Sequence, residues 1–135
     1  MTVPVKDLKG ATDAILAKLK ELAIPDNEKL IEAAASPAER KELAAACGCT
    51  PADILALANR ADLARIKGIA GVYSDLLEHA GVDTVKELAR RRPDNLLEKL
   101  TEINEAAKLT QRLPTAAMVE DWVNQAKALP TALTY

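Results

Sequence analysis

The chain has 135 residues, a length that suits one compact domain or two small lobes sharing a core. It carries 18 basic and 20 acidic side chains, a net charge of −2, and so lacks the basic bias usual in proteins that hold duplex DNA. Its 26 Ala and 19 Leu favour closely packed helices, and the absence of Phe, with one Trp and two Tyr, argues against a surface for base stacking.

Capping residues mark the helices expected in the first half. We expect helices over about 11–23, 26–35, 37–47 and 51–61, the third of them ended by Gly48. The last three each follow a side chain that can accept a hydrogen bond from the first turn: Asp26, Ser36 and Thr50. Pro at the first helical position supports two of these starts.

The second half follows the same scheme. A short segment over 62–66 and a tight hairpin over 67–70 lead into helices over about 71–80, 83–91, 93–109 and 115–129. In this interpretation Asp83 and Thr115 cap the second and the fourth, and Trp122 is a core residue of the fourth. No segment alternates with period two, so we predict an all-α fold without strands.

Two stretches of the chain read as copies of one another, about 58 positions apart. Leu8-Lys9-Gly10 and Ile24 align with Ile66-Lys67-Gly68 and Val82, and Leu30 aligns with Leu88. Farther along, five residues of the first half, Thr50, Ile54, Leu57, Asn59 and Ala61, align with Thr115, Val119, Trp122, Asn124 and Ala126. Such a repeat indicates one supersecondary unit used twice. We predict a first unit over 1–61, a second over 62–129, and a flexible tail over 130–135.

The segment 66–71, Ile-Lys-Gly-Ile-Ala-Gly, resembles a helix-hairpin-helix motif, which reads apolar, any residue, Gly, apolar, Gly and then a helix. A hairpin of this kind frees backbone N–H groups at a helix N-terminus, where an anion can bind. Ala70 stands at the second glycine of the pattern. In the first copy that place is taken by Thr12, and Asp13 brings a negative charge.

In known families these hairpins hold a DNA phosphate, and the resemblance implies the same use here. The phosphate-binding residues that it implies are Lys67, Gly68, Ala70, Gly71 and Arg65 in the second copy and Lys9 and Gly10 in the first. Arg90-Arg91-Arg92 could join Arg65 and Lys67 in a basic patch, but we favour the interpretation that they complement a helix C-terminus and stay solvated.

The whole-chain pattern of tandem hairpins with a closing helix, best from Leu63 to Tyr135, is similar to the bacterial family filed as domain of unknown function 4332. The resemblance implies an all-α fold of two tandem helix-hairpin-helix-like repeats packed into one compact helical domain, related to DNA-binding modules.

Two functions agree with these observations. The first is a non-enzymatic binding module that contacts a DNA phosphate backbone without sequence preference. The second is a protein-protein interaction or assembly module that kept the fold and lost nucleic-acid binding. Each half of the chain sums to a charge of −1, which weakens the first, and neither the ligand nor the oligomeric state follows from the sequence.

Other function classes find less support. His79 has no second histidine or nucleophile to pair with, and Val72 stands where helix-hairpin-helix glycosylases place a catalytic lysine, so we expect no enzyme activity. Cys47 and Cys49 are expected to be reduced thiols without a metal, and no cofactor is expected. No apolar run is long enough to cross a membrane and the first ten residues lack a signal-peptide core, so we expect no membrane partner and a cytoplasmic location.

Overall fold

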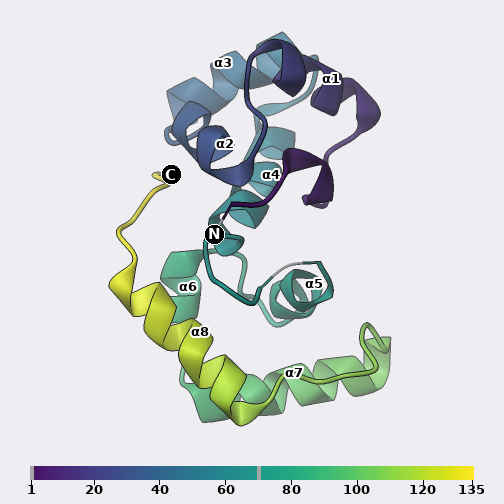
Figure 1. The fold of residues 1–135 in the computed structure, drawn as a ribbon, viewed down its shortest axis with the longest axis vertical. Coiled ribbons are helices and arrows are strands. Elements are labelled where there is room, and N and C mark those ends of the chain that lie inside the picture. Colours follow the sequence, from purple (N-terminus) through teal and green to yellow (C-terminus); the bar gives the residue numbers. More distant parts are fainter. Residues whose placement is uncertain (1, 70) are drawn as a thin grey trace.

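The computed structural model describes residues 2–69 and 71–135, and over these residues the protein is all-α and contains no strand (Figure 1). One short 3-10 helix precedes eight α-helices. In chain order they are η1 (Val5–Asp7), α1 (Asp13–Glu21), α2 (Asn27–Ala33), α3 (Pro37–Cys47), α4 (Pro51–Leu63), α5 (Val72–His79), α6 (Val85–Ala89), α7 (Pro93–Ala107) and α8 (Ala116–Ala128).

Side-chain caps begin six of the α-helices, because a hydroxyl or carboxylate there accepts a hydrogen bond from an N–H that has no partner within the helix. These caps are Thr12, Asp26, Ser36, Thr50, Thr84 and Thr115. The cap expected at Asp83 is wrong by one residue. Thr84 accepts the N–H of Glu87 at 3.1 Å, and α6 ends at Ala89 rather than near Arg91.

The helices form two lobes, each around its own apolar cluster. In the N-terminal lobe, α1 packs on α3, and α2 and α3 pack on α4; in the C-terminal lobe, α5 packs on α7, and α6 and α7 pack on α8. Figure 1 shows the lobes one above the other, with α4 running from the upper lobe toward the lower. Because Ala61 belongs to the first cluster and Leu63 to the second, the end of α4 is part of both cores.

The last six residues differ from the flexible tail expected from the sequence. Leu133 is only 4 % exposed and lies in the apolar cluster of the N-terminal lobe, and the Thr134 N–H donates to the Ala35 carbonyl at 2.8 Å. The buried guanidinium of Arg40 donates to the carbonyl oxygens of Ala34 and Thr134 at 2.9 and 2.6 Å. A buried arginine needs such acceptors, and the C-terminal segment supplies one of them.

Trp122 is the largest side chain of the C-terminal core, as its helical spacing predicted. It is 2 % exposed, and its ring lies 5.4 Å from that of Tyr73, centroid to centroid. The hairpin backbone approaches it closely, because a Cβ on Gly68 would stand 3.1 Å from the indole Nε1. Gly68 therefore serves both the turn, with φ at +98°, and the packing of the tryptophan.

The close contact between Gly68 and Trp122 predicts that two matched substitutions lower the free energy of unfolding by different amounts. Gly10 has the same φ of +98° but no atom within 4 Å of a Cβ, so Gly10→Ala should cost only backbone strain, about 1 kcal/mol. Gly68→Ala adds the contact with Trp122 and should cost about 1–2 kcal/mol more. Urea unfolding of the two variants measures the difference. Equal losses of unfolding free energy in the two variants would show that the Trp122 indole moves aside without cost.

Candidate functional site

The predicted hairpin of the C-terminal lobe lies between α4 and α5. Gly68 and Gly71 have φ values of +98° and +53°, which glycine adopts without strain. Between them Ile69 is completely buried, and its N–H donates to the Ile66 carbonyl at 3.2 Å. Ala70 lies outside the described residues. The turn thus holds an apolar side chain in the core and leaves Lys67 and Gly68 at the surface.

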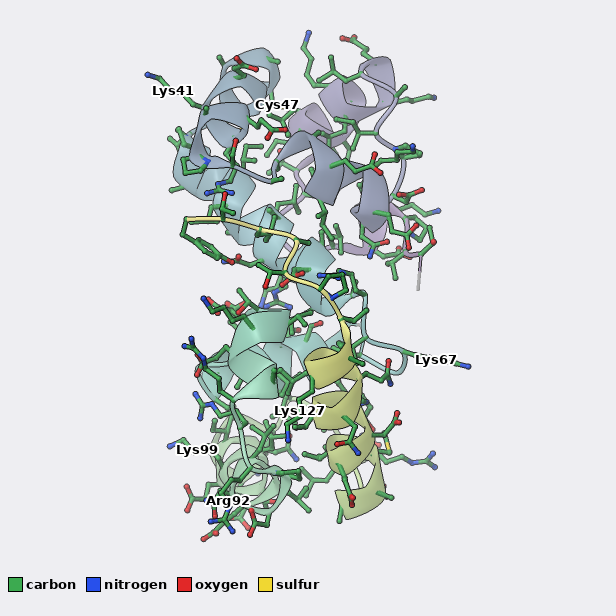
Figure 2. All side chains as sticks on the ribbon, turned by 90° about the vertical axis from the view of Figure 1, so that its left-hand side faces the viewer. Lys41, Cys47, Lys67, Arg92, Lys99 and Lys127 are labelled. Atoms are coloured by element: carbon green, nitrogen blue, oxygen red, sulfur yellow. The ribbon has the colours of Figure 1, made fainter. Side chains whose placement is uncertain are left out.

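Lys67 is the cation of this hairpin that faces solvent, and Figure 2 shows its side chain projecting away from the ribbon. Its backbone is fixed by Gln125 on α8. The Lys67 N–H donates to Gln125 Oε1 at 2.8 Å, and Gln125 Nε2 donates to the Lys67 carbonyl at 3.0 Å. The ammonium is therefore available to a ligand, whereas the backbone N–H that a phosphate would use already has an acceptor.

Arg65, a second residue of the predicted phosphate site, makes internal contacts. Its guanidinium donates to Asp62 Oδ1 and to the Pro130 carbonyl, both at 2.8 Å, and its side chain is 13 % exposed. Asp62 in turn accepts the N–H of Val85 at the start of α6. Arg65 thus connects the hairpin to the C-terminal segment, a role that sequence spacing could not reveal.

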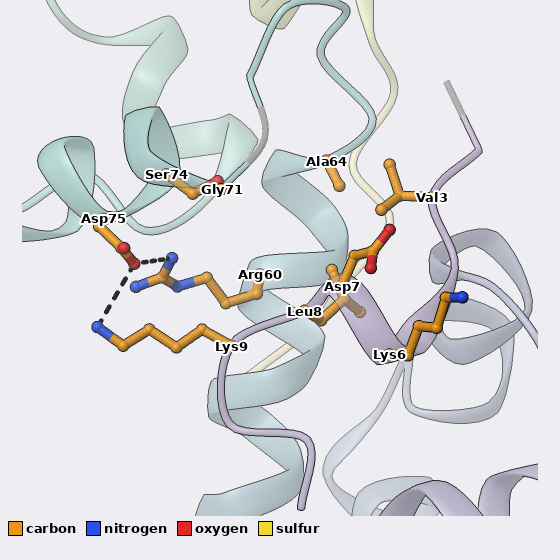
Figure 3. A pocket seen from close by; sticks show the side chains of 10 residues that line it. All are labelled: Val3, Lys6, Asp7, Leu8, Lys9, Arg60, Ala64, Gly71, Ser74 and Asp75. Atoms are coloured by element: carbon orange, nitrogen blue, oxygen red, sulfur yellow. Dashed lines mark hydrogen bonds and ion pairs between the residues drawn. The ribbon is translucent and has the colours of Figure 1, made fainter. Parts of the chain in front are cut away.

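Lys9, from the first hairpin, lies at a cavity of about 470 Å³ between the lobes. Figure 3 shows Lys9 and Arg60 pointing toward Asp75 on α5, whereas Lys6 points away from it. Lys9 Nζ lies 3.5 Å from Asp75 Oδ1. Of the residues predicted to bind phosphate, Lys9 and Gly71 line this cavity together.

Arg60 provides the strongest charged contact of the cavity. Its side chain is 8 % exposed, and it donates to Asp75 Oδ1 and Glu78 Oε2, each at 2.7 Å. No sequence pattern assigns Arg60 a role, because its partners lie 15 and 18 residues farther along the chain. Because Asp75 and Glu78 compensate the positive charges of Arg60 and Lys9, the cavity does not form a basic site.

Two of the arginines that follow α6 form local ion pairs. Arg91 pairs with Glu87 at 3.1 Å, and Arg92 pairs with Asp94 at 3.3 Å. Figure 2 shows Arg92 and Lys67 on separate parts of the molecule. Local ion pairs and the helix end explain Arg91 and Arg92 without a ligand.

An apolar groove of about 350 Å³ opens on the surface of the N-terminal lobe, between the N-terminal segment and α1. Six apolar residues and two lysines line it: Pro4, Val5, Leu16, Ala23, Ile24 and Pro25, with Lys6 and Lys20. Both lysines are exposed, and neither forms an ion pair with the described part of the chain. The groove therefore combines an apolar floor with positive charge and no acidic side chain. No sequence pattern predicts the groove, because its residues come from separate segments.

The remaining reactive side chains form no cluster. His79 Nδ1 lies 2.8 Å from the Asp75 carbonyl of its own helix. Cys47 and Cys49 are free, and burial raises the pKa of both thiols, assisted by Cys49 at the first and by Asp53 at the second. In residues 2–69 and 71–135 no group of His, Cys, Asp and Glu could hold a metal ion, and no helix is long and apolar enough to cross a membrane.

Comparison with known proteins identifies the family. Residues 9–129 match the family described as domain of unknown function (DUF4332), so the chain belongs to it, as the sequence pattern predicted. Searches of curated proteins and of solved structures found no match to the chain.

The charged contact between the lobes predicts unequal effects of two substitutions. Arg60→Ala removes a buried cation and leaves Asp75, 24 % exposed, without its main partner, so it should cost about 2 kcal/mol of unfolding free energy. Lys9→Ala removes a side chain that is 63 % exposed and should cost less than about 0.5 kcal/mol. Urea unfolding checks both values. Similar losses of unfolding free energy in the two variants would contradict the conclusion that Arg60 makes the main charged contact between the lobes.

Proposed function

We propose that this member of the DUF4332 family is a non-enzymatic protein-interaction module whose docking surface is the apolar groove. The observation that carries the proposal is the lining of the groove, which is apolar apart from two lysines. Two of the cations implied for phosphate binding, Arg65 and Lys9, instead pair with carboxylates of their own chain. The groove thus has the composition of a protein contact, an apolar floor with charges at its edge.

The module consists of two helix-hairpin-helix-like units in tandem. Gly10 and Gly68, 58 positions apart, share a φ of +98°. The turns around them also share a hydrogen bond: the Ala11 N–H donates to the Leu8 carbonyl at 3.3 Å, and the corresponding bond of the second turn, from Ile69 to Ile66, measures 3.2 Å. The recurring helix pairs support the same interpretation.

Ala23 supports a function for the groove. It has a φ of +60°, a left-handed conformation that disfavours side chains, and its counterpart in the C-terminal lobe is Gly81, with a φ of +86°. Ala23 lines the groove, so its methyl group adds apolar surface there at the expense of backbone strain. Such strain in a non-glycine residue is often kept for function.

Site-specific photo-crosslinking tests the docking surface in its natural setting. A photoreactive residue replacing Lys20 should give protein adducts in a nuclease-treated native lysate, whereas the same residue replacing Lys41, an exposed lysine of α3, should give few. Ala23→Gly should reduce the adducts at position 20 without lowering the melting temperature, since it removes the methyl group and the strain together. Equal labelling at positions 20 and 41 would contradict the proposal. In a parallel lysate without nuclease, adducts with nucleic acid and none with protein would also contradict it.

A second candidate function, binding of a DNA phosphate backbone, is favoured by one observation. Lys67 is exposed next to two glycines with positive φ, and its ammonium has no ion pair among the described residues. In this alternative Lys67, Gly68 and Gly71 contact the phosphate, as the hairpin resemblance implies.

Charge reversal at Lys67 distinguishes the two candidates. A DNA-binding module should bind a duplex at low salt, and Lys67→Glu should weaken binding far more than Lys41→Glu, because only the first charge lies at the hairpin. Fluorescence anisotropy at several salt concentrations measures both affinities. A dissociation constant weaker than about 10⁻⁴ M, or equal effects of the two reversals, would contradict this alternative.

A further inference from the structure

The floor of the apolar groove is fixed by the core of the N-terminal lobe. Val5 and Ile24 are 8 % and 7 % exposed and belong to the apolar cluster of that lobe. The volume of about 350 Å³ lies at the lower end of the range of about 300–1,000 Å³ for pockets that bury a whole small molecule. The groove is thus a preformed recess of a size that suits a few side chains of a partner.

The backbone around the groove offers little to a partner, because its N–H groups are already used. The Val5 N–H donates to the Pro25 carbonyl at 3.1 Å, and those of Ala23 and Ile24 donate to carbonyls of α1 at 3.2 and 2.9 Å. Pro4 and Pro25 have no N–H of their own. An added strand needs a row of free N–H and C=O groups, and these five residues supply no free N–H. Recognition at the groove therefore falls to side chains.

The charge of the groove selects a partner of the opposite sign. Lys6 and Lys20 line it without any acidic side chain, and neither has an ion pair with the described part of the chain. In the second unit, Glu78 stands at the position of Lys20 and receives the cation Arg60. Because position 20 carries the opposite charge, its complement is a carboxylate.

We propose that the groove receives an amphipathic α-helix of a partner protein, with apolar side chains at helical spacing and Asp or Glu beside them. This inference rests on the proposed function and names the chemical class of its partner. A helix satisfies its own backbone and presents side chains at i, i+3 or i+4 and i+7, which is what a groove without free backbone N–H groups can bind. The apolar side chains contact Val5, Leu16 and Ile24, and the carboxylates pair with Lys6 and Lys20.

An anionic membrane is the main competing partner, because lysines next to apolar side chains also suit a lipid surface. Insertion into a bilayer needs apolar side chains that project from the protein. Val5 and Ile24 instead lie in the floor of a recess. The recess therefore favours the side chains of a helix over a bilayer.

Peptide selection on the purified full chain tests the class of partner. Phage displaying random peptides of about 16 residues, long enough for four helical turns, are enriched on wild type, on Lys20→Glu and on Lys41→Glu. Lys41 is exposed on α3 and does not line the groove. Wild type and Lys41→Glu should enrich peptides of net negative charge with apolar residues at helical spacing. Lys20→Glu should lose this class, because it places like charges across the contact.

The affinity of one enriched peptide then separates charge from shape. Fluorescence anisotropy should give a dissociation constant of about 10⁻⁵ M for wild type, in keeping with a small contact. Lys20→Glu should weaken binding at least about tenfold, and Lys41→Glu less than about twofold. Proline in the middle of the peptide should abolish binding, since it breaks a helix but not an extended segment. With lysine in place of its acidic residues, the peptide should prefer the variant Lys6→Glu/Lys20→Glu to wild type.

Every other result counts against the inference. Enriched peptides that are basic or extended, equal effects of Lys20→Glu and Lys41→Glu, or no enriched peptide at all would overturn it. Binding of the chain to phosphatidylserine vesicles in place of peptides would do the same. Should the photoreactive residue at position 20 still label a protein, the proposed function would stand and only the class of partner would fail. Loss of that labelling as well would remove both.

Discussion

The contact of Arg60 with Asp75 and Glu78 is the interaction on which the arrangement of the two lobes depends. Arg60 lies in the last turn of α4, only three residues before Leu63 enters the second apolar cluster. Its guanidinium is buried, so the position of α5 must supply acceptors for it. This requirement fixes α5 against the end of α4, and with α5 comes the hairpin that precedes it.

The C-terminal segment completes this arrangement from the opposite direction. Pro130 accepts a hydrogen bond from Arg65 in the C-terminal lobe, and Leu133 lies in the apolar cluster of the N-terminal lobe. The chain therefore connects its two cores twice, once through α4 and once through its last residues. Two connections restrict rotation between the lobes more than one would, and they restrict the surfaces left open to a partner.

Local patterns were sufficient to predict the helices, except for the cap and the end of α6. Thr50 with Asp53, and Ser36 with Pro37, form starts whose capping bonds lie within one turn, so neighbouring residues determine them. The contacts of Arg65 with Pro130, and of Arg40 with Thr134, join residues far apart in the chain. No spacing rule contains that information, and for this reason the C-terminal segment was expected to be flexible and Arg65 to face a phosphate. The groove was missed for the same reason.

The repeat explains how one fold can present two different surfaces. Packing requires the residues that both units share, such as the buried pair Leu30 and Leu88, whereas the exposed positions are free to differ. At one of these positions the first unit has Lys20 and the second has Glu78. Glu78 accepts a hydrogen bond from Arg60, whereas Lys20 has no ion pair with the described part of the chain. Because of this exchange of sign, the first unit cannot receive an arginine in the way that α5 of the second unit receives Arg60.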